Sequence, residues 1–187
     1  MVVAHCDDEI IMGFPILQQS LPDLSILCCT SDRNNPNRKK WRRRSEAFYS
    51  LCSDMNINCK CLDYDSGFYK TESRNGNLSA VISNILENIM LFNSDTIYTH
   101  NAWGEYGHLD HMLVSSIVTC NFHKVITSDI FIPSNWTPYK SIHTYQYAGC
   151  PEIKNDIEKY NAAKKYYDNI HCWTWNKEPV KKCKIKM

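Results

Sequence analysis

The alternation of strand-like and helix-like segments over residues 1–120 constrains the fold of this chain more than any other feature. Strands are predicted for the short apolar runs at residues 2–3, 24–30, 58–62 and 96–99. Strands that alternate with helices through short connections favour a parallel sheet with helices on both faces. We therefore predict an α/β fold that is Rossmann-like and doubly wound, with a mostly parallel sheet. We expect residues 1–187 to form a single domain, because a chain of 187 residues can bury one sizeable core.

Helices are predicted where apolar residues recur every three or four positions. They cover residues 10–19, 38–54, 78–92, 112–120 and 155–168. Gly13 and Pro15 weaken the first of these helices, and the polar composition of the last predicts a surface location. The side chains expected to face the core are Trp41, Ala47, Phe48 and Leu51 in the second helix, and Val81, Ile82, Ile85, Leu86, Ile89 and Met90 in the third.

The remaining segments carry weaker signals. Residues 30–37 and 63–76 are rich in turn-forming residues and are expected to be loops. Further strands are expected at residues 125–131 and 141–147. The lysine-rich C-terminal end is expected to fray, as poorly anchored chain ends commonly do.

Composition narrows the class of partner. A net charge of +1 gives no overall attraction to nucleic acid or to anionic membranes. No apolar run reaches the roughly 20 residues of a membrane-spanning helix, and the chain starts directly in an acidic segment rather than in a signal peptide. The ten cysteines are scattered without a C-x-x-C pair, so we interpret them as mostly reduced, buried thiols. We expect a cytoplasmic protein without a membrane anchor.

One basic run has three interpretations. It is Arg-Lys-Lys-Trp-Arg-Arg-Arg, at residues 38–44. Basic residues around an aromatic can bind nucleic acid. Because the net charge of the whole chain is near zero, a solvated helix face is favoured instead. The run could also attract an anionic group on a small substrate.

Two polar clusters follow predicted strands. His5, Asp7, Asp8 and Glu9 come directly after the first strand, and residues 100–111 come after the fourth. Carboxylates crowded this closely resist ionisation unless a cation lies among them, although acidic residues are also common at helix starts. Both clusters are expected at the carboxyl edge of a parallel sheet, where such folds bind ligands.

The second cluster carries metal-ligand spacing of its own. His108 and His111 lie three residues apart at a helix start, which puts both on one face, with Asp110 between them. Imidazole and carboxylate together suit a borderline metal ion such as zinc. The sequence therefore predicts one metal site built from both clusters.

The motifs Ala-His-Cys-Asp-Asp-Glu at residues 4–9 and Gly-His-Leu-Asp-His at residues 107–111 resemble the PIG-L/LmbE family of zinc-dependent N-acetylglucosamine de-N-acetylases. The resemblance spans roughly residues 1–120. It implies that His5, Asp8 and His111 hold one zinc ion per chain. The implied reaction removes the N-acetyl group from an N-acetylglucosamine-containing sugar or glycoconjugate by attack of a zinc-bound water.

The resemblance also implies roles for other residues. Asp7 is the expected general base, His108 the acid or oxyanion stabiliser paired with Asp110, and Tyr106 a contact of the tetrahedral intermediate. Arg43, in an Arg-x-x-Glu match with Glu46, is an expected substrate contact. Asp65 in Asp-Ser-Gly at residues 65–67 is a second one. The expected partner is the small-molecule or glycoconjugate substrate, with no nucleic acid. A homo-oligomeric state stays open.

The chain departs from the family pattern at several positions. Cys6 and Leu109 replace the two motif prolines, so both turns lose a fixed φ angle. Ser31-Asp32 stands where the family often has a glycine-containing loop. These departures leave room for a metal-binding pseudoenzyme or interaction module of the same fold. A nucleotide-binding Rossmann protein and a Cys6–His nucleophile pair are further alternatives, although no G-x-G-x-x-G follows the first strand.

Overall fold

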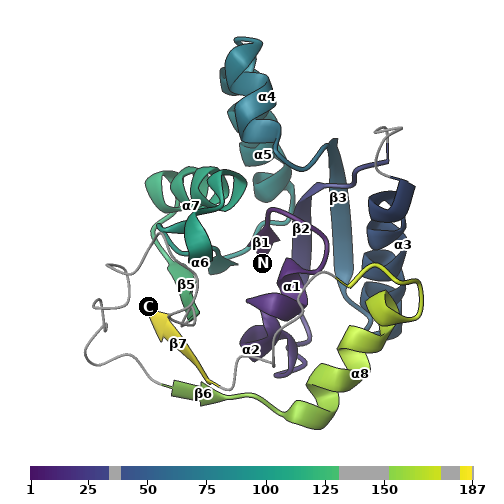
Figure 1. The fold of residues 1–187 in the computed structure, drawn as a ribbon. Helices are drawn as coiled ribbons and strands as arrows, with labels where there is room; N and C mark the ends of the chain where they lie inside the picture. Colours follow the sequence, from purple (N-terminus) through teal and green to yellow (C-terminus); the bar gives the residue numbers. More distant parts are fainter. Residues whose placement is uncertain (34–38, 131–151, 174–181, 187) are drawn as a thin grey trace.

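The computed structural model describes residues 1–33, 39–130, 152–173 and 182–186 (Figure 1). Its strands form two hydrogen-bonded sheets. The first sheet has the parallel strands β1 (Val2–Val3), β2 (Ser25–Thr30) and β3 (Asn58–Tyr64) in spatial order. The second has the order β4 (Ile97–Thr99), β5 (Val125–Ile130), β7 (Lys182–Lys186) and β6 (Glu152–Lys154). In the second sheet β4 and β5 are parallel, whereas β7 runs antiparallel to both of its neighbours.

Side-chain hydrogen bonds join β1 to β4, where the two sheets meet. The Thr99 hydroxyl donates to the Val2 carbonyl at 3.0 Å, and the Ala4 N–H donates to His100 Nε2 at 2.8 Å. The strands therefore lie in the order β3, β2, β1, β4, β5, and the chain winds outward in both directions from β1 and β4. This confirms the predicted Rossmann-type fold. The antiparallel strands β6 and β7 are an addition that the sequence pattern did not predict.

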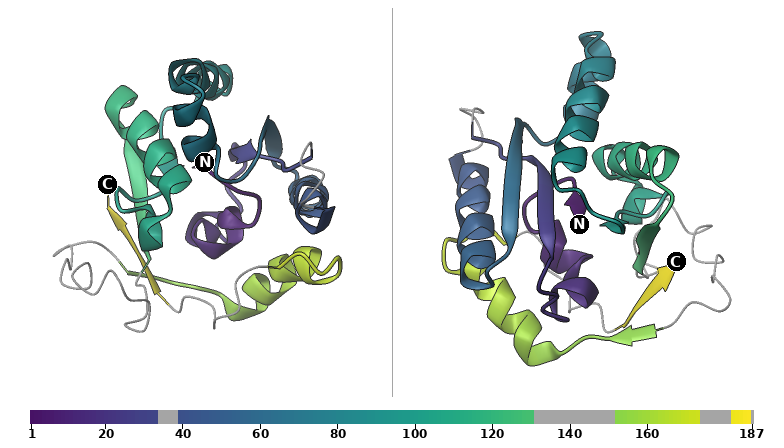
Figure 2. Two further views of the ribbon diagram at one scale, coloured as in Figure 1. Left: turned by 45° about the horizontal axis from the view of Figure 1, so that its top comes forward. Right: turned by 180° about the vertical axis from the view of Figure 1, so that it is seen from behind.

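Helices cover both faces of the strands, as predicted (Figures 1 and 2). One face carries α1 (Asp8–Ile11), α2 (Phe14–Leu17), α3 (Lys39–Asp54) and α8 (Ile157–Asp168). The other face carries α4 (Phe68–Arg74), α5 (Leu78–Leu91) and α7 (Leu109–Asn121). The short α6 (Gly104–Gly107) lies in the turn after β4.

The core follows the two-residue period of a strand that is buried on both faces. Ile26 and Cys28 of β2 pack toward α3, whereas Leu27 and Cys29 pack toward α5 and α7. In α3 the predicted inward residues Ala47, Phe48 and Leu51 are buried. The side chain of Trp41 lies outside the described part of the chain.

Several local expectations are wrong. The helix expected at residues 10–19 is two short helices, and a Cβ on Gly13 between them would lie only 2.7 Å from Met1 Sδ. The loop expected at residues 63–76 contains α4. Met90 is 69% exposed rather than inward, because it lies beyond the buried stripe of Val81, Ile85 and Ile89.

The C-terminal part also differs from expectation. Helix α8 was expected on the surface, but its residues Tyr160, Ala163 and Tyr167 are buried in the core. Residues 182–186 of the end that was expected to fray form β7. The strand expected at residues 141–147 lies outside the described residues. Within the described ranges, the helices are too short or too polar to cross a lipid bilayer.

Candidate metal centre and active site

The turn after β1 is fully buried and is shaped by its own polar groups. The His5 N–H donates to Asp8 Oδ2 at 2.8 Å, and the Asp7 N–H donates to Glu9 Oε2 at 2.9 Å. Asp7 has a φ of +102°, a conformation that costs energy for a residue other than glycine. Such strain persists only where the surroundings enforce it, and here it turns His5 and Asp8 toward the same point.

The turn after β4 brings His111 to that point. Gly104 has a φ of +59°, and a Cβ there would lie 2.9 Å from Met112 Cγ and 3.2 Å from His111 Cβ. Only glycine therefore lets this turn approach the start of α7 so closely. His111 lies in the first turn of α7, and its side chain is buried.

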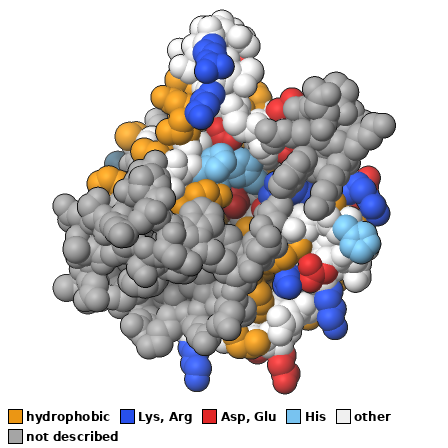
Figure 3. All heavy atoms as spheres, in the orientation of Figure 1, with side chains coloured by type: hydrophobic (Ala, Val, Ile, Leu, Met, Phe, Trp, Pro, Cys, Tyr) orange, Lys and Arg blue, Asp and Glu red, His pale blue; other side chains and the backbone are white. Residues whose placement is uncertain are grey.

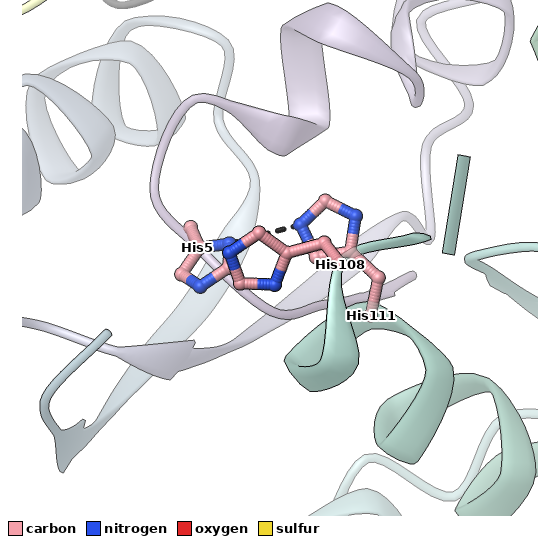
Figure 4. Close-up of side chains that lie close together, drawn as sticks. All are labelled: His5, His108 and His111. Carbon is pink, nitrogen blue, oxygen red and sulfur yellow. Dashed lines mark hydrogen bonds between the residues drawn. The ribbon is translucent and has the colours of Figure 1, made fainter. Parts of the chain in front are cut away.

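Three potential ligand atoms form a nearly equilateral triangle. His5 Nδ1 lies 3.0 Å from His111 Nε2, the contact marked by a dashed line in Figure 4. Asp8 Oδ2 lies 3.2 Å from His5 Nδ1 and 3.3 Å from His111 Nε2. Three ligands of a tetrahedral zinc ion, each at about 2.0–2.1 Å, lie about 3.3 Å from one another. The triangle therefore fits one face of a zinc coordination shell, and the fourth position stays open.

Each of the two histidines has a carboxylate on its other ring nitrogen. His5 Nε2 donates to Asp110 Oδ2 at 3.1 Å, and His111 Nδ1 donates to Glu105 Oε2 at 2.6 Å. With protons on His5 Nε2 and His111 Nδ1, as these contacts assign them, a bound metal would find the lone pairs of His5 Nδ1 and His111 Nε2 in the triangle once the proton that His111 holds without a metal has left. A carboxylate behind a metal-ligating imidazole fixes the ring and raises its basicity.

The electrostatics of the cluster favour a positive charge at the triangle. Burial alone would raise the pKa of Asp8, but His111 and His5 hold that pKa well below its usual range. Burial alone would lower the pKa of His111, but Asp8 and Glu105 raise it to about 10. A proton on His111 therefore balances the negative charge of Asp8 and Glu105, and a divalent cation at the triangle would balance that charge in the same way.

Two further histidines lie beside the triangle. His100 also lies within reach of Asp8 and His111, but its Nε2 accepts the Ala4 N–H and its Nδ1 donates to Glu105 at 2.9 Å. Both ring nitrogens of His100 are therefore engaged, which leaves no lone pair for a metal. His108 stacks on His111 with ring centroids 4.5 Å apart, and it could also join a metal site with His5 and His111.

Asp110 does not support His108 as predicted. The Asp110 carboxylate accepts from His5 and from the Gly67 and Tyr69 N–H groups at 2.6 and 3.0 Å. Its hydrogen bond to His108 comes from its backbone N–H, which donates to His108 Nδ1 at 3.3 Å and caps α7. Burial and the neighbouring His5 and His111 lower the pKa of His108 to about 4, although the nearby Asp110 carboxylate acts to raise it.

The structure places Arg44 rather than Arg43 in the site. The Arg44 guanidinium donates to Asp7 Oδ1, and both side chains are buried. The Arg43 side chain is 51% exposed and lies 4.0 Å from Glu46. Successive helical residues point about 100° apart, so the register of α3 selects Arg44.

The other predicted site residues lie close to the cluster. Tyr106 packs edge-on against His108 and His111, with ring centroids 5.9 and 5.6 Å apart. Asp65 is half-buried and lies two residues before Gly67, which binds Asp110. In the space-filling view, histidine side chains reach the surface near the middle of one face, next to acidic and hydrophobic side chains (Figure 3). His108 is half-buried, whereas His5, Asp8 and His111 are almost completely buried.

Sequence reasoning missed some supporting residues. Glu105 and His100 were part of the second cluster but received no role, although a glutamate six residues before His111 was a visible signal. Tyr167 of α8 donates to Glu9 Oε1 at 2.5 Å from a helix 158 residues away along the chain. No local pattern signals that contact.

Comparison with known proteins matches residues 1–121 to the family described as PIG-L, GlcNAc-PI de-N-acetylase. The chain belongs to the PIG-L/LmbE family. The match ends with α7 and contains both motif turns, so the whole candidate metal centre lies within the PIG-L part of the chain.

Relatives of the chain include "Uncharacterized protein L374" of Acanthamoeba polyphaga mimivirus. It is 28% identical over 130 residues, which cover 63% of this chain and 55% of that protein. The chain thus spans about half the length of this curated relative.

Solved structures also resemble the PIG-L chain. The A40926 pseudoaglycone deacetylase Dbv21 has a TM-score of 0.60 at 13% identity, covering 89% of this chain and 79% of that one. The N,N'-diacetylchitobiose deacetylase of Pyrococcus horikoshii has a TM-score of 0.55 at 10% identity, covering 92% and 69%. At these identities the likeness shows a shared fold.

Proposed function

We propose that this chain is a zinc-dependent hydrolase that removes the N-acetyl group from an N-acetylglucosamine-containing sugar or glycoconjugate. The observation that carries the proposal is the triangle of His5 Nδ1, Asp8 Oδ2 and His111 Nε2, with a carboxylate behind each histidine. His5, Asp8 and His111 would hold one zinc ion. When bound, zinc supplies Lewis-acid polarisation of the amide and lowers the pKa of water at its open position.

Asp7 is the proposed general base. It directly precedes the ligand Asp8, and its carboxylate is held by the buried guanidinium of Arg44. That contact fixes the carboxylate in one orientation, so it can accept a proton from a water that attacks the amide carbonyl. Arg44 is therefore a positioning residue for Asp7.

His108 is the proposed donor to the oxygen that becomes negatively charged. Because His108 Nδ1 accepts the Asp110 N–H, the proton of the neutral ring lies on Nε2, from which it can be donated. Tyr106 packs against His108, and its hydroxyl is proposed as a second hydrogen-bond donor to that oxygen. Asp110 acts through His5, and Asp65 keeps its proposed role as a sugar contact.

The substrate class is proposed from the family. The PIG-L description names a de-N-acetylase of GlcNAc-PI, and the two similar structures are named as deacetylases of A40926 pseudoaglycone and of N,N'-diacetylchitobiose. GlcNAc-PI and N,N'-diacetylchitobiose both carry an N-acetyl amide on an amino sugar. Eight cysteines, from Cys6 to Cys172, are free thiols in the structure, as expected for a reducing, cytoplasmic compartment.

The direct test is amine release from a panel of N-acetylglucosaminides by purified protein with added zinc or with a chelator. We expect release that requires zinc. Asp8→Ala should lose both zinc and activity, whereas Asp7→Asn should keep zinc and lose turnover. Glu87→Gln, a change at an exposed carboxylate on α5, serves as the matched control and should remain active. Full activity of Asp7→Asn would remove the assignment of the base.

A metal-binding pseudoenzyme is the second candidate, because Cys6 and Leu109 replace both motif prolines. It would bind zinc with the same three ligands and release no amine from any acetamide in the panel. Restored activity in Cys6→Pro would identify the lost proline as the cause.

A further inference from the structure

Three thiols converge directly beneath the metal-site turn, and we call Cys6, Cys28 and Cys61 the thiol cluster. Cys6 Sγ lies 3.5 Å from Cys28 Sγ and 3.6 Å from Cys61 Sγ, and all three sulfurs lie within 4.8 Å of one another. Cys28 and Cys61 are register partners on the parallel strands β2 and β3, so their side chains share one face of the sheet. Cys6 completes the group from the turn after β1.

The geometry points to a second metal site, and we propose that the thiol cluster binds one soft metal ion of the Zn²⁺ or Cu⁺ class through three thiolates. Zinc–thiolate bonds of about 2.3 Å place neighbouring sulfurs of a tetrahedral site about 3.8 Å apart. The two measured separations fall short of that spacing by only a few tenths of an ångström. Thiolate ligands select such ions over magnesium or calcium. On binding, each thiol exchanges its S–H bond for a sulfur–metal bond, and the protons leave to solvent.

The charges around the cluster act in both directions. Burial raises the pKa of the Cys6 and Cys28 thiols, and Glu9 raises that of Cys6 further, so a bound ion has to displace their protons. Arg33 lies close enough to Cys61 for electrostatic attraction, and its guanidinium lies over the Tyr49 ring, whose hydroxyl accepts the Cys61 N–H at 3.0 Å. Arg33 would offset part of the negative charge that thiolates leave on a bound ion, whereas Arg44 is already paired with Asp7. The positive charge of the ion itself supplies the remaining compensation that buried thiolates need.

A disulfide fits the same residues less well. An S–S bond is about 2.05 Å long, so Cys6 and Cys28 would have to approach by about 1.5 Å within a closely packed core. A metal ion needs much smaller shifts and engages all three sulfurs. Cys28 and Cys6 are almost completely buried, whereas Cys61 is only half-buried and leaves a route for the ion.

Cys6 connects the thiol cluster with the His/Asp centre, because it lies between His5 and Asp7 in the chain. In the family motif this position is a proline, whose ring fixes φ. An ion bound to Cys6 would instead tie the turn to β2 and β3. The proposed metal site thus supplies a restraint that the missing proline no longer gives.

The experiment uses Cd²⁺ as the probe, because thiolate-bound Cd²⁺ has a charge-transfer absorption in the ultraviolet. The reduced chain is titrated with Cd²⁺, and we expect an absorption that saturates at about one ion per chain. Cys61→Ser, at the half-buried position, and Cys28→Ser should each lose most of that absorption. Circular dichroism checks that the variants fold.

Matched controls separate this site from the His/Asp centre and from general thiol binding. Cys29→Ser, on the opposite face of β2, and Cys120→Ser, at an exposed position, should keep the full absorption. Asp8→Ala should also keep it, because the His/Asp centre contributes no sulfur. No absorption in the folded, reduced chain would overturn the proposal, as would an absorption that survives in Cys61→Ser.

Discussion

The two turns that build the candidate metal centre are supported in opposite ways. The turn after β4 supports itself: Glu105 holds both His100 and His111 and accepts the Asn101 N–H at 3.1 Å. The turn after β1 has hydrogen bonds of its own, but its side chains are also held by distant elements. Its Asp7 is held by Arg44 of α3 and its Glu9 by Tyr167 of α8, and its His5 is oriented by Asp110 of α7.

This difference means that the centre is completed only when the whole fold is assembled. His111 can take its tautomer from a residue six positions away, whereas His5 requires α7 to dock before its Nε2 finds a carboxylate. The strained backbone of Asp7 likewise needs α3 in place. We expect changes in α3 and α8 to reach the metal site through the first turn, although these helices supply no proposed ligand.

Replacement of Arg44 should have the largest effect on the stability of the first turn. Arg44→Ala removes the guanidinium from a buried carboxylate and should destabilise the fold by about 3–5 kcal/mol, the cost of breaking one side of a buried ion pair. Zinc affinity should fall with it, because Asp7 and Asp8 share one turn. Urea unfolding with and without zinc measures both effects. Wild-type stability in Arg44→Ala would show that the first turn does not depend on α3.

Replacement of Glu105 tests the self-supported turn. Glu105→Gln keeps the shape of the side chain but removes the charge behind His111, which should weaken zinc binding by about 10- to 100-fold. Competition with a chromophoric chelator measures the affinity. Asp110→Asn is the corresponding change behind His5. Equal affinity in wild type and Glu105→Gln would separate Glu105 from the metal site.

The contact from α8 should contribute less. Tyr167→Phe leaves a buried oxygen of Glu9 without its hydroxyl donor, and the expected cost is about 1–2 kcal/mol in the free energy of unfolding. Tyr166→Phe is the matched control, since the neighbouring tyrosine bonds Asp54 at an exposed position and should change stability by less than about 0.5 kcal/mol. Equal losses in the two variants would remove the link between α8 and the first turn.

The same contrast explains which features could be predicted from the sequence. Local patterns predicted the strands and most helices of residues 1–121, because each depends on the period of its own apolar residues. Motif spacing and sheet topology together predicted that the two turns meet, and His5, Asp8 and His111 do lie together.

The features that sequence reasoning missed depend on orientation between elements. The family resemblance paired Asp110 with His108, but the start of α7 directs the Asp110 carboxylate across to His5. The polar pattern of α8 concealed Tyr167, whose partner lies in another part of the fold. Such contacts are set by how helices dock, which periodicity within one helix does not determine.

The smallest expected effect concerns Arg43, the arginine that the family pattern singled out. Arg43→Ala removes a half-exposed side chain whose ion pair with Glu46 is long, at 4.0 Å, and exposed pairs of this kind contribute little. We expect stability within about 0.5 kcal/mol of wild type and unchanged zinc affinity, in contrast to Arg44→Ala. Steady-state kinetics on a substrate that the zinc-loaded enzyme turns over adds the decisive readout. A raised KM in Arg43→Ala with normal stability would show that Arg43 reaches the substrate from the exposed side of α3, the role that the motif predicted.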